Sequence, residues 1–174
     1  MLLPKRLIPA LITGAALSAT VALAQQPATQ APAAQEMRTF ASAADVAALI
    51  AKSKSERKDG QAIVTQKILQ FAPYSATLEY RPTAGAAAVH EKDAEMFYII
   101  DGSGTLVTGG KLVDEKRTNA TNLSGTAIQG GETKTVSKGD FFVIPEGTPH
   151  WFSAVASPVV LMQIKVPRGG TAAQ

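Results

Sequence analysis

Two histidines, His90 and His150, are the imidazoles through which this chain could bind a metal or move a proton. Cysteine is absent, which excludes thiolate metal sites, disulfides and cysteine nucleophiles. Glu95 is the nearest carboxylate after His90 that opens an apolar run. On a straight strand their offset would put these two side chains on opposite faces, about 17 Å apart. They can share a site only if the chain bends at residues 91–94, a polar quartet that we interpret as a hairpin connection.

His150 follows Glu95 by 55 positions, so only closure of a sheet can bring its imidazole to the same place. The preceding residues, 145–149, read Pro-Glu-Gly-Thr-Pro. This sequence predicts a rigid turn that delivers His150 onto the start of a strand.

The elements that must position these side chains are predicted from short runs of β-branched and aromatic residues bounded by Gly, Pro, Asp or Asn. Within 74–80, apolar and polar residues alternate, which predicts a strand with one face in water. We interpret Gly102-Ser103-Gly104 as a tight turn between strands. The long stretch 103–138 has room for an extra hairpin or a lid. The predicted strands are 63–71, 74–80, 96–100, 105–108, 141–144 and 158–166.

One helix is predicted before the strands. Ser42 and Asp45 form an S-x-x-D capping box, and Val46, Leu49 and Ile50 follow with helical spacing. We expect an amphipathic helix over about 43–53 and find no later segment of convincing helical period. The predicted fold class is therefore all-β, a β-sandwich or barrel with a short N-terminal helix, and a compact jelly roll needs about this much chain.

The two histidine segments resemble the paired motifs of the cupin superfamily, in its small single-domain, type-2-like form. The first motif is written G-x5-H-x-H-x(3,4)-E-x6-G, and here His90, Glu95 and Gly102 have its H-x4-E-x6-G spacing. The second is written G-x5-P-x-G-x2-H-x3-N, and residues 139–150 reproduce it as far as His150. The resemblance covers about residues 61–166 and implies a jelly-roll barrel. The sequence departs from the motifs where Ala88 replaces the first histidine, Pro82 the first glycine and Ala154 the final asparagine.

By this resemblance, His90, Glu95 and His150 are metal ligands, and Glu95 is also a catalytic proton acceptor. Two imidazoles and one carboxylate suit a divalent Fe, Mn, Zn or Ni ion with open positions. Strand alternation turns Phe97 to the side of Glu95 and Phe152 to the side of His150, so both are candidate substrate contacts. Gln163, on the last predicted strand, is a third candidate, with an exposed strand face as the alternative.

The termini predict export. Residues 1–24 combine Lys5 and Arg6, an apolar run and an Ala-Leu-Ala cleavage site, which is typical of a signal peptide, with a retained membrane anchor as the alternative. Cleavage lowers the formal net charge from +3 to +1, which removes the electrostatic case for nucleic acid and leaves no stable membrane span. We expect a periplasmic or secreted protein. Its divisions are a disordered linker at 25–41, the helix and its connection at 42–59, a cupin domain at 60–168 and a flexible tail at 169–174.

Three classes of function remain open after the resemblance. The first is a metal-dependent enzyme, an oxygenase, isomerase, lyase or decarboxylase, acting on a small organic acid, phenolic compound or sugar derivative. The second is a small-molecule-binding module without turnover, which the degenerate motif at Ala88 favours. The third is a structural barrel. A homodimer formed through edge strands is a further expectation from the resemblance.

Overall fold

The computed structural model describes residues 37–167. The predicted signal peptide, most of the predicted linker and the predicted tail lie outside the described residues. Arg38, which we placed in the linker, exchanges two backbone hydrogen bonds with Gln70, of 2.8 and 2.9 Å. The chain is therefore attached to the domain before the helix begins. Within the described range, no helix has the length and apolar character needed to cross a membrane.

Helix α1 (Ala43–Glu56) begins at the predicted capping box. The side chain of Ser42 accepts a hydrogen bond from the Asp45 backbone N–H, and the Asp45 carboxylate accepts one from the Ser42 backbone. The helix ends three residues later than the predicted Ser53, whose hydroxyl is buried and donates to the Leu49 carbonyl. An ion pair between Lys52 and Glu56 joins the end of the added turn to the preceding turn.

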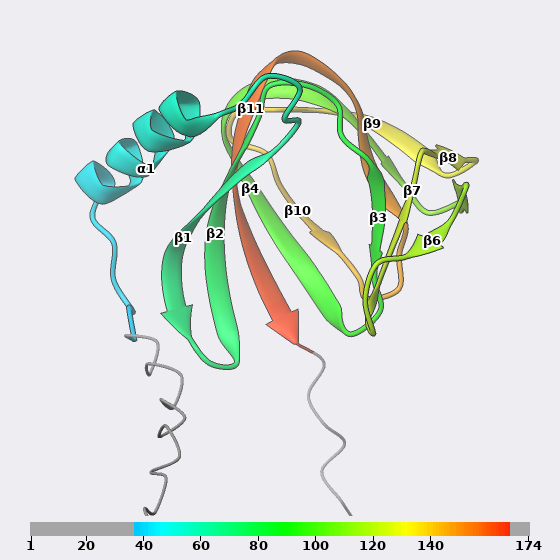
Figure 1. Ribbon diagram of the computed structural model, residues 1–174, viewed down its shortest axis with the longest axis horizontal. Helices are drawn as coiled ribbons and strands as arrows, with labels where there is room; N and C mark the ends of the chain where they lie inside the picture. The colour runs from blue at the N-terminus through cyan, green and yellow to red at the C-terminus, as the bar shows by residue number, and fades with distance from the viewer. Residues whose placement is uncertain (1–36, 168–174) are drawn as a thin grey trace, which may run out of the picture. The chain divides into compact units, whose positions relative to one another are not determined.

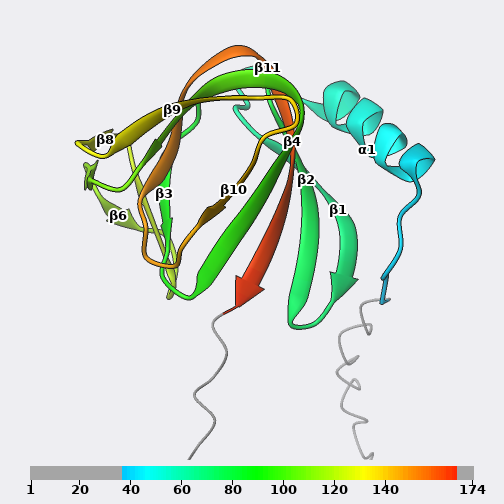
Figure 2. The same ribbon diagram turned by 180° about the vertical axis from the view of Figure 1, so that it is seen from behind.

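The predicted barrel is confirmed (Figures 1 and 2). Its path of paired strands runs β1-β2-β11-β3-β7-β6, while β4 pairs with β9, β10 and β11. A separate small sheet joins β5 and β8. The strands are β1 (Val64–Phe71), β2 (Tyr74–Arg81), β3 (Ala87–His90), β4 (Asp93–Thr108), β5 (Lys111–Val113), β6 (Lys116–Arg117), β7 (Asn122–Gly125), β8 (Ala127–Gln129), β9 (Glu132–Ser137), β10 (Phe141–Ile144) and β11 (His150–Pro167).

Strands β4 and β11 are long, bent and paired along most of their length, which closes the barrel. The predicted turn at residues 102–104 is therefore wrong, because these residues continue β4. Gly102 has a φ of +84°, and a Cβ added there would collide with the Pro158 carbonyl on β11. The glycine permits a bend and a close approach of two strands, where the sequence pattern suggested a reversal of direction.

Strand β2 alternates as predicted, but its polar face is not turned to open water. The apolar side chains Ala76 and Leu78 are buried in a cluster that packs against Val46, Leu49 and Ile50 of α1. The polar side chains of the opposite face line a cavity inside the barrel. The helix thus covers the outer face of β2, and the polar residues are left for the interior. These polar residues are Ser75, Thr77, Glu79 and Arg81.

The stretch between the two motifs contains the predicted extra hairpin in the form of β5 to β8. Strand β5 pairs with β8, and β6 pairs with β7. Strand β7 also pairs with β3, so that Asn122 lies opposite His90 in the register. This excursion therefore adds a strand beside one of the candidate ligands.

Candidate metal centre and its cavity

His90 and Glu95 meet through a corner of the barrel. The hairpin that we predicted at residues 91–94 is wrong, because β3 pairs with β7 and β11, whereas β4 pairs with β9, β10 and β11. The chain passes from one side of the barrel to the other after His90. The end of β3 and the start of β4 then turn their side chains toward the same interior space.

His150 arrives on the turn that the sequence predicted. The Gly147 backbone N–H donates to the His90 carbonyl at 2.7 Å, and the Gly109 N–H donates to the Pro149 carbonyl at 2.8 Å. These two hydrogen bonds tie the turn to β3 and to the end of β4. His150 is then the first residue of β11, opposite Ala88 in the register.

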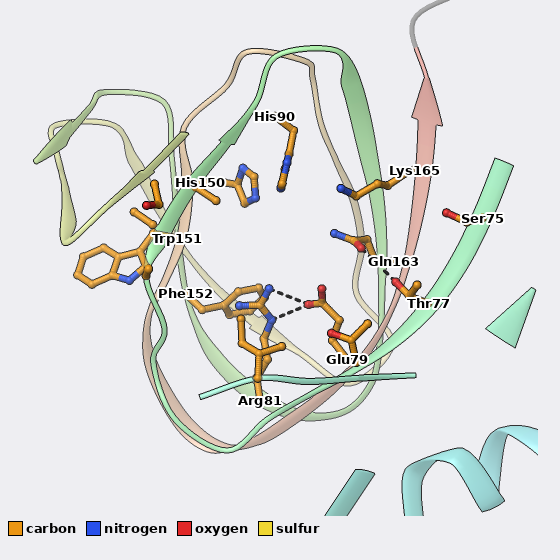
Figure 3. A pocket seen from close by; sticks show the side chains of 16 residues that line it. Ser75, Thr77, Glu79, Arg81, His90, His150, Trp151, Phe152, Gln163 and Lys165 are labelled. Atoms are coloured by element: carbon orange, nitrogen blue, oxygen red, sulfur yellow. Dashed lines mark hydrogen bonds and ion pairs between the residues drawn. The ribbon is translucent and has the colours of Figure 1, made fainter. Parts of the chain in front are cut away.

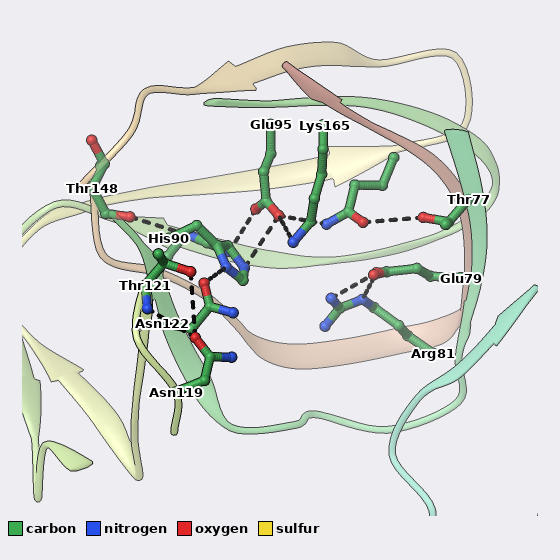
Figure 4. A network of polar contacts seen from close by, with 12 residues as sticks. Thr77, Glu79, Arg81, His90, Glu95, Asn119, Thr121, Asn122, Thr148 and Lys165 are labelled. Atoms are coloured by element: carbon green, nitrogen blue, oxygen red, sulfur yellow. Dashed lines mark hydrogen bonds and ion pairs between the residues drawn. The ribbon is translucent and has the colours of Figure 1, made fainter. Parts of the chain in front are cut away.

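The three predicted ligands lie close together, as Figure 3 shows for His90 and His150 and Figure 4 for His90 and Glu95. Nε2 of His90 lies 3.2 Å from Oε1 of Glu95, and Nε2 of His150 lies 3.1 Å from Oε2. One ligand atom from each residue lies within 4.8 Å of the others, so the cluster could hold a metal ion. Glu95 is 1% exposed and His150 is 8% exposed, whereas His90 is half-buried.

Hydrogen bonds on the far side of each imidazole fix which nitrogen faces Glu95. Nδ1 of His90 lies 2.8 Å from Oδ1 of Asn122, and Nδ1 of His150 lies 3.1 Å from the Thr148 carbonyl. Both partners are acceptors, so each neutral imidazole carries its proton on Nδ1. The two Nε2 lone pairs therefore point at a carboxylate. A carbonyl or amide oxygen behind a histidine is the arrangement that orients metal-bound imidazoles.

Oε2 of Glu95 is buried and has no hydrogen bond among the described residues. The nitrogen nearest to it, Nε2 of His150, would form an ion pair only with a protonated imidazole. A buried anionic oxygen facing nitrogen lone pairs is unfavourable, and a cation between them resolves the conflict. The donor set thus fits a divalent metal.

The pKa directions agree with this fit. Burial lowers the pKa of His90 below its ordinary value of 6.5, with attraction to Glu95 opposing the change. Burial also acts to raise the pKa of Glu95, but a hydrogen bond and positive charge from His150 in its protonated form, together with the charges of protonated His90 and of Lys165, more than offset it and hold this pKa below 4.5. Neutral imidazoles and an ionised carboxylate are the forms that bind metals.

The cluster opens onto a cavity of about 500 Å³ inside the barrel (Figure 3). Of the predicted substrate contacts, Phe152 and Gln163 line this cavity. Phe97 lies instead in the apolar core, stacked on Phe142 with ring centroids 5.1 Å apart and 6.3 Å from the His150 ring. Its position favours a packing role beneath the histidine, and a substrate contact at Phe97 stays a prediction.

Gln163 takes the inward orientation, one of the two alternatives that the sequence left open. Its amide donates to Oε1 of Glu95 at 2.7 Å, and its carbonyl accepts from the Thr77 hydroxyl at 3.1 Å. Both amide atoms are thereby engaged by the protein. The geometry shows Gln163 linking β2, β11 and β4 behind the candidate metal site, and a contact with substrate stays a prediction.

Two residues near the site were missed by the sequence analysis. Lys165 places its Nζ 3.6 Å from Oε1 of Glu95, and it follows Gln163 by two positions, so strand alternation alone could have indicated it. Asn122 lies 32 positions from His90, in a segment whose pairing the sequence did not predict. No spacing rule connects those two residues.

Comparisons with known proteins place the chain in a family. A model of the cupin family matches residues 80–173. No curated protein matches this sequence. Similar solved structures include KdgF from Halomonas sp., at 17% identity over 64% of this chain and 86% of that chain, with a TM-score of 0.46. TT1209 from Thermus thermophilus is 19% identical over 66% of this chain and 92% of that chain, with a TM-score of 0.45. A Streptomyces Pac13 variant with uridine is 13% identical over 67% of this chain and 78% of that chain, also with a TM-score of 0.45.

Proposed function

This chain belongs to the cupin family, and we propose that it is an exported cupin that holds a divalent metal and acts on a small organic molecule. The ligands would be His90, Glu95 and His150, and the substrate would enter the cavity lined by Phe152. The observation that carries the proposal is the buried Glu95 carboxylate, whose Oε2 lacks a hydrogen bond while two imidazole Nε2 atoms face the carboxylate.

Three protein ligands leave positions open on a divalent ion, which is typical of catalytic sites. When bound, such an ion would polarise a substrate oxygen or activate a bound water. The donor set suits Fe, Mn, Zn or Ni. The protein's own contribution is to hold the donors in place, through Asn122, Thr148 and Gln163, and to enclose the reacting groups against Phe152.

A second candidate function is a binding module without turnover, and Ala88 favours it. This residue occupies the position of the missing motif histidine, lies opposite His150 in the register and lines the cavity. Its methyl group offers no ligand atom. A small molecule could supply the metal ligand that the missing histidine does not, and it would then remain bound to the metal. The cavity would in that case hold the molecule without turning it over.

Elemental analysis of the full chain, produced with its own N-terminal segment, tests the metal proposal. We expect about one Fe, Mn, Zn or Ni ion per chain in the wild type and in the surface control Lys138→Ala, and none in His150→Ala. A wild-type protein without metal after exposure to each of the four ions would overturn the proposal. Turnover of small acids, phenols and sugars separates an enzyme from a binding module.

Export is proposed from the sequence of residues 1–24. Fractionation of the source cells, with mass determination of the mature protein, tests it. A periplasmic or secreted chain beginning at Gln25 would agree with the proposal, and an intact chain in the cytoplasm would contradict it. The homodimer stays a prediction.

A further inference from the structure

The charged side chains of the cavity divide into two pairs. Glu79 and Arg81 lie on β2 with an N–O distance of 2.7 Å, and each side chain is about one-tenth exposed. The Arg81 guanidinium also lies 5.0 Å from the centroid of the Phe152 ring. Since Arg81 is paired and stacked, its charge is already compensated by a protein group.

The positive charge of Lys165 is less fully compensated by protein groups than that of Arg81. Its Nζ lies 3.6 Å from Oε1 of Glu95, but the Gln163 amide already donates to that oxygen at 2.7 Å. The Lys165 side chain is 33% exposed and lines the cavity, and Figure 3 shows it reaching in from the same wall as Gln163. The ammonium group can therefore move from Glu95 to a molecule in the cavity without leaving that oxygen unbonded.

The proposed metal changes the charge balance of this space. Without the metal, the negative charges of Glu79 and Glu95 balance the positive charges of Arg81 and Lys165 when both histidines are neutral. A divalent ion adds two positive charges, and no further acidic residue among the described ones lines the cavity. Because the cavity is partly enclosed, water screens this excess less than it would at the surface. The space then favours an anion.

We propose that Lys165 is the anion-recognising residue of this cavity and that the ligand is a small organic carboxylate. The inference rests on the proposed function and narrows its substrate class from acids, phenols and sugars to acids. The carboxylate would accept a hydrogen bond from Nζ of Lys165, beside the open metal positions. A single ammonium fits a carboxylate better than a phosphate, which binds most strongly where several donors converge.

Lactate and its uncharged amide, lactamide, form a matched pair of probes for this inference. Calorimetric titration of the metal-loaded full chain measures the affinity for each, and elemental analysis of every sample measures its metal content. A charge-assisted hydrogen bond predicts that lactate binds about 10- to 100-fold more tightly than lactamide. Lys165→Met should remove most of this preference, Lys165→Arg should retain most of it, and the exposed Lys138→Met should leave it unchanged.

The inference is overturned if Lys165→Met retains its metal and its preference for lactate, or if the wild type binds both probes equally. Failure of the proposed function would be recognised by a different result, namely that the wild-type chain contains no metal. In that case the same titrations are made on the metal-free chain. A preference for lactate that depends on Lys165 would still support anion recognition, and its absence would end the inference.

Discussion

Glu95 is almost completely buried, yet its pKa is held below the ordinary value, so the carboxylate is ionised at neutral pH. Replacement by glutamine keeps the volume and removes the charge. We expect Glu95→Gln to weaken metal binding by more than about 100-fold, the upper end of what loss of an outer hydrogen-bond partner costs. Competition with a chelator of known affinity measures this loss.

In the metal-free protein, the same substitution should cost part of the stability that the ionised carboxylate contributes, because the lowered pKa of Glu95 means that the fold favours the charged form. The glutamine amide should limit this loss by donating a hydrogen bond to an imidazole Nε2 that now faces a carboxylate. Urea unfolding of both metal-free proteins checks this. Metal binding that survives Glu95→Gln would show that the carboxylate is not a ligand.

Asn122 acts on the site through His90, because its Oδ1 lies 2.8 Å from Nδ1 of the imidazole. Loss of such an outer partner typically costs about 10- to 100-fold in metal affinity. We therefore expect about this loss in Asn122→Ala, and recovery in Asn122→Asp, which still offers an acceptor. Equal metal affinity in all three proteins would mean that the hydrogen bond does not orient the ligand.

The pKa of His90 gives the metal-free protein a defined pH dependence. Burial lowers this pKa below 6.5 in the folded state, so below that pH the unfolded chain binds more protons. The free energy of unfolding should therefore fall as the pH drops below about 6.5, and Glu95, with its lowered pKa, adds a loss of the same sign below about 4.5. Urea unfolding between about pH 7.5 and 5.5 measures the slope. An unchanged slope in His90→Gln would argue against this origin.

At the scale of elements, the sequence predicted what depends on neighbouring residues. The capping box at Ser42, the strand β10 and the turn before His150 are set by local chemistry, and each is found. The orientation of β2 was not predictable in the same way. Alternation looks the same whether the polar face meets solvent or a cavity, and only the packing of α1 on the other face decides between them.

The residues of the candidate site show the same difference between local patterns and long-range pairing. His90, Glu95 and His150 could be predicted because two motifs fix their spacing, although the corner that unites them was taken for a hairpin. Lys165 follows from strand alternation once Gln163 is turned inward, but Asn122 enters the site through pairing of distant strands. Such pairing depends on the register of the whole sheet, which no local pattern contains.

Gly102 offers a test of how β4 and β11 approach. Gly102→Ala forces a side chain into a positive φ, which costs about 1–2 kcal/mol, and also against the Pro158 carbonyl, which adds about 1–3 kcal/mol. Gly139→Ala is the matched control, since Gly139 has a φ of +94° and no neighbour within 4 Å. Denaturant unfolding should show the larger loss for Gly102→Ala. Equal losses would mean that backbone conformation alone matters and that the strands can separate without cost.

At the scale of the whole molecule, the three candidate ligands come from three strands, of which two are consecutive and the third is distant in sequence. His90 ends β3, Glu95 lies near the start of β4, and His150 begins β11. A metal held by all three binds the folded barrel and has no equivalent site in the unfolded chain. It should therefore stabilise the fold by mass action. The apolar core, however, lies beneath the site and does not include the ligands.

These two facts set the expected result of removing the metal. A metal present at about 100 times its Kd contributes about 2.7 kcal/mol, so chelation should lower the Tm by roughly 10 °C. The far-ultraviolet circular dichroism at about 25 °C should remain that of a folded β protein, because closure of β4 on β11 does not need the ion. His150→Ala, treated with the same chelator, should show no further decrease in Tm. Unfolding at room temperature upon chelation would show that the metal is structural, and the site would then have to be closed where we infer open positions.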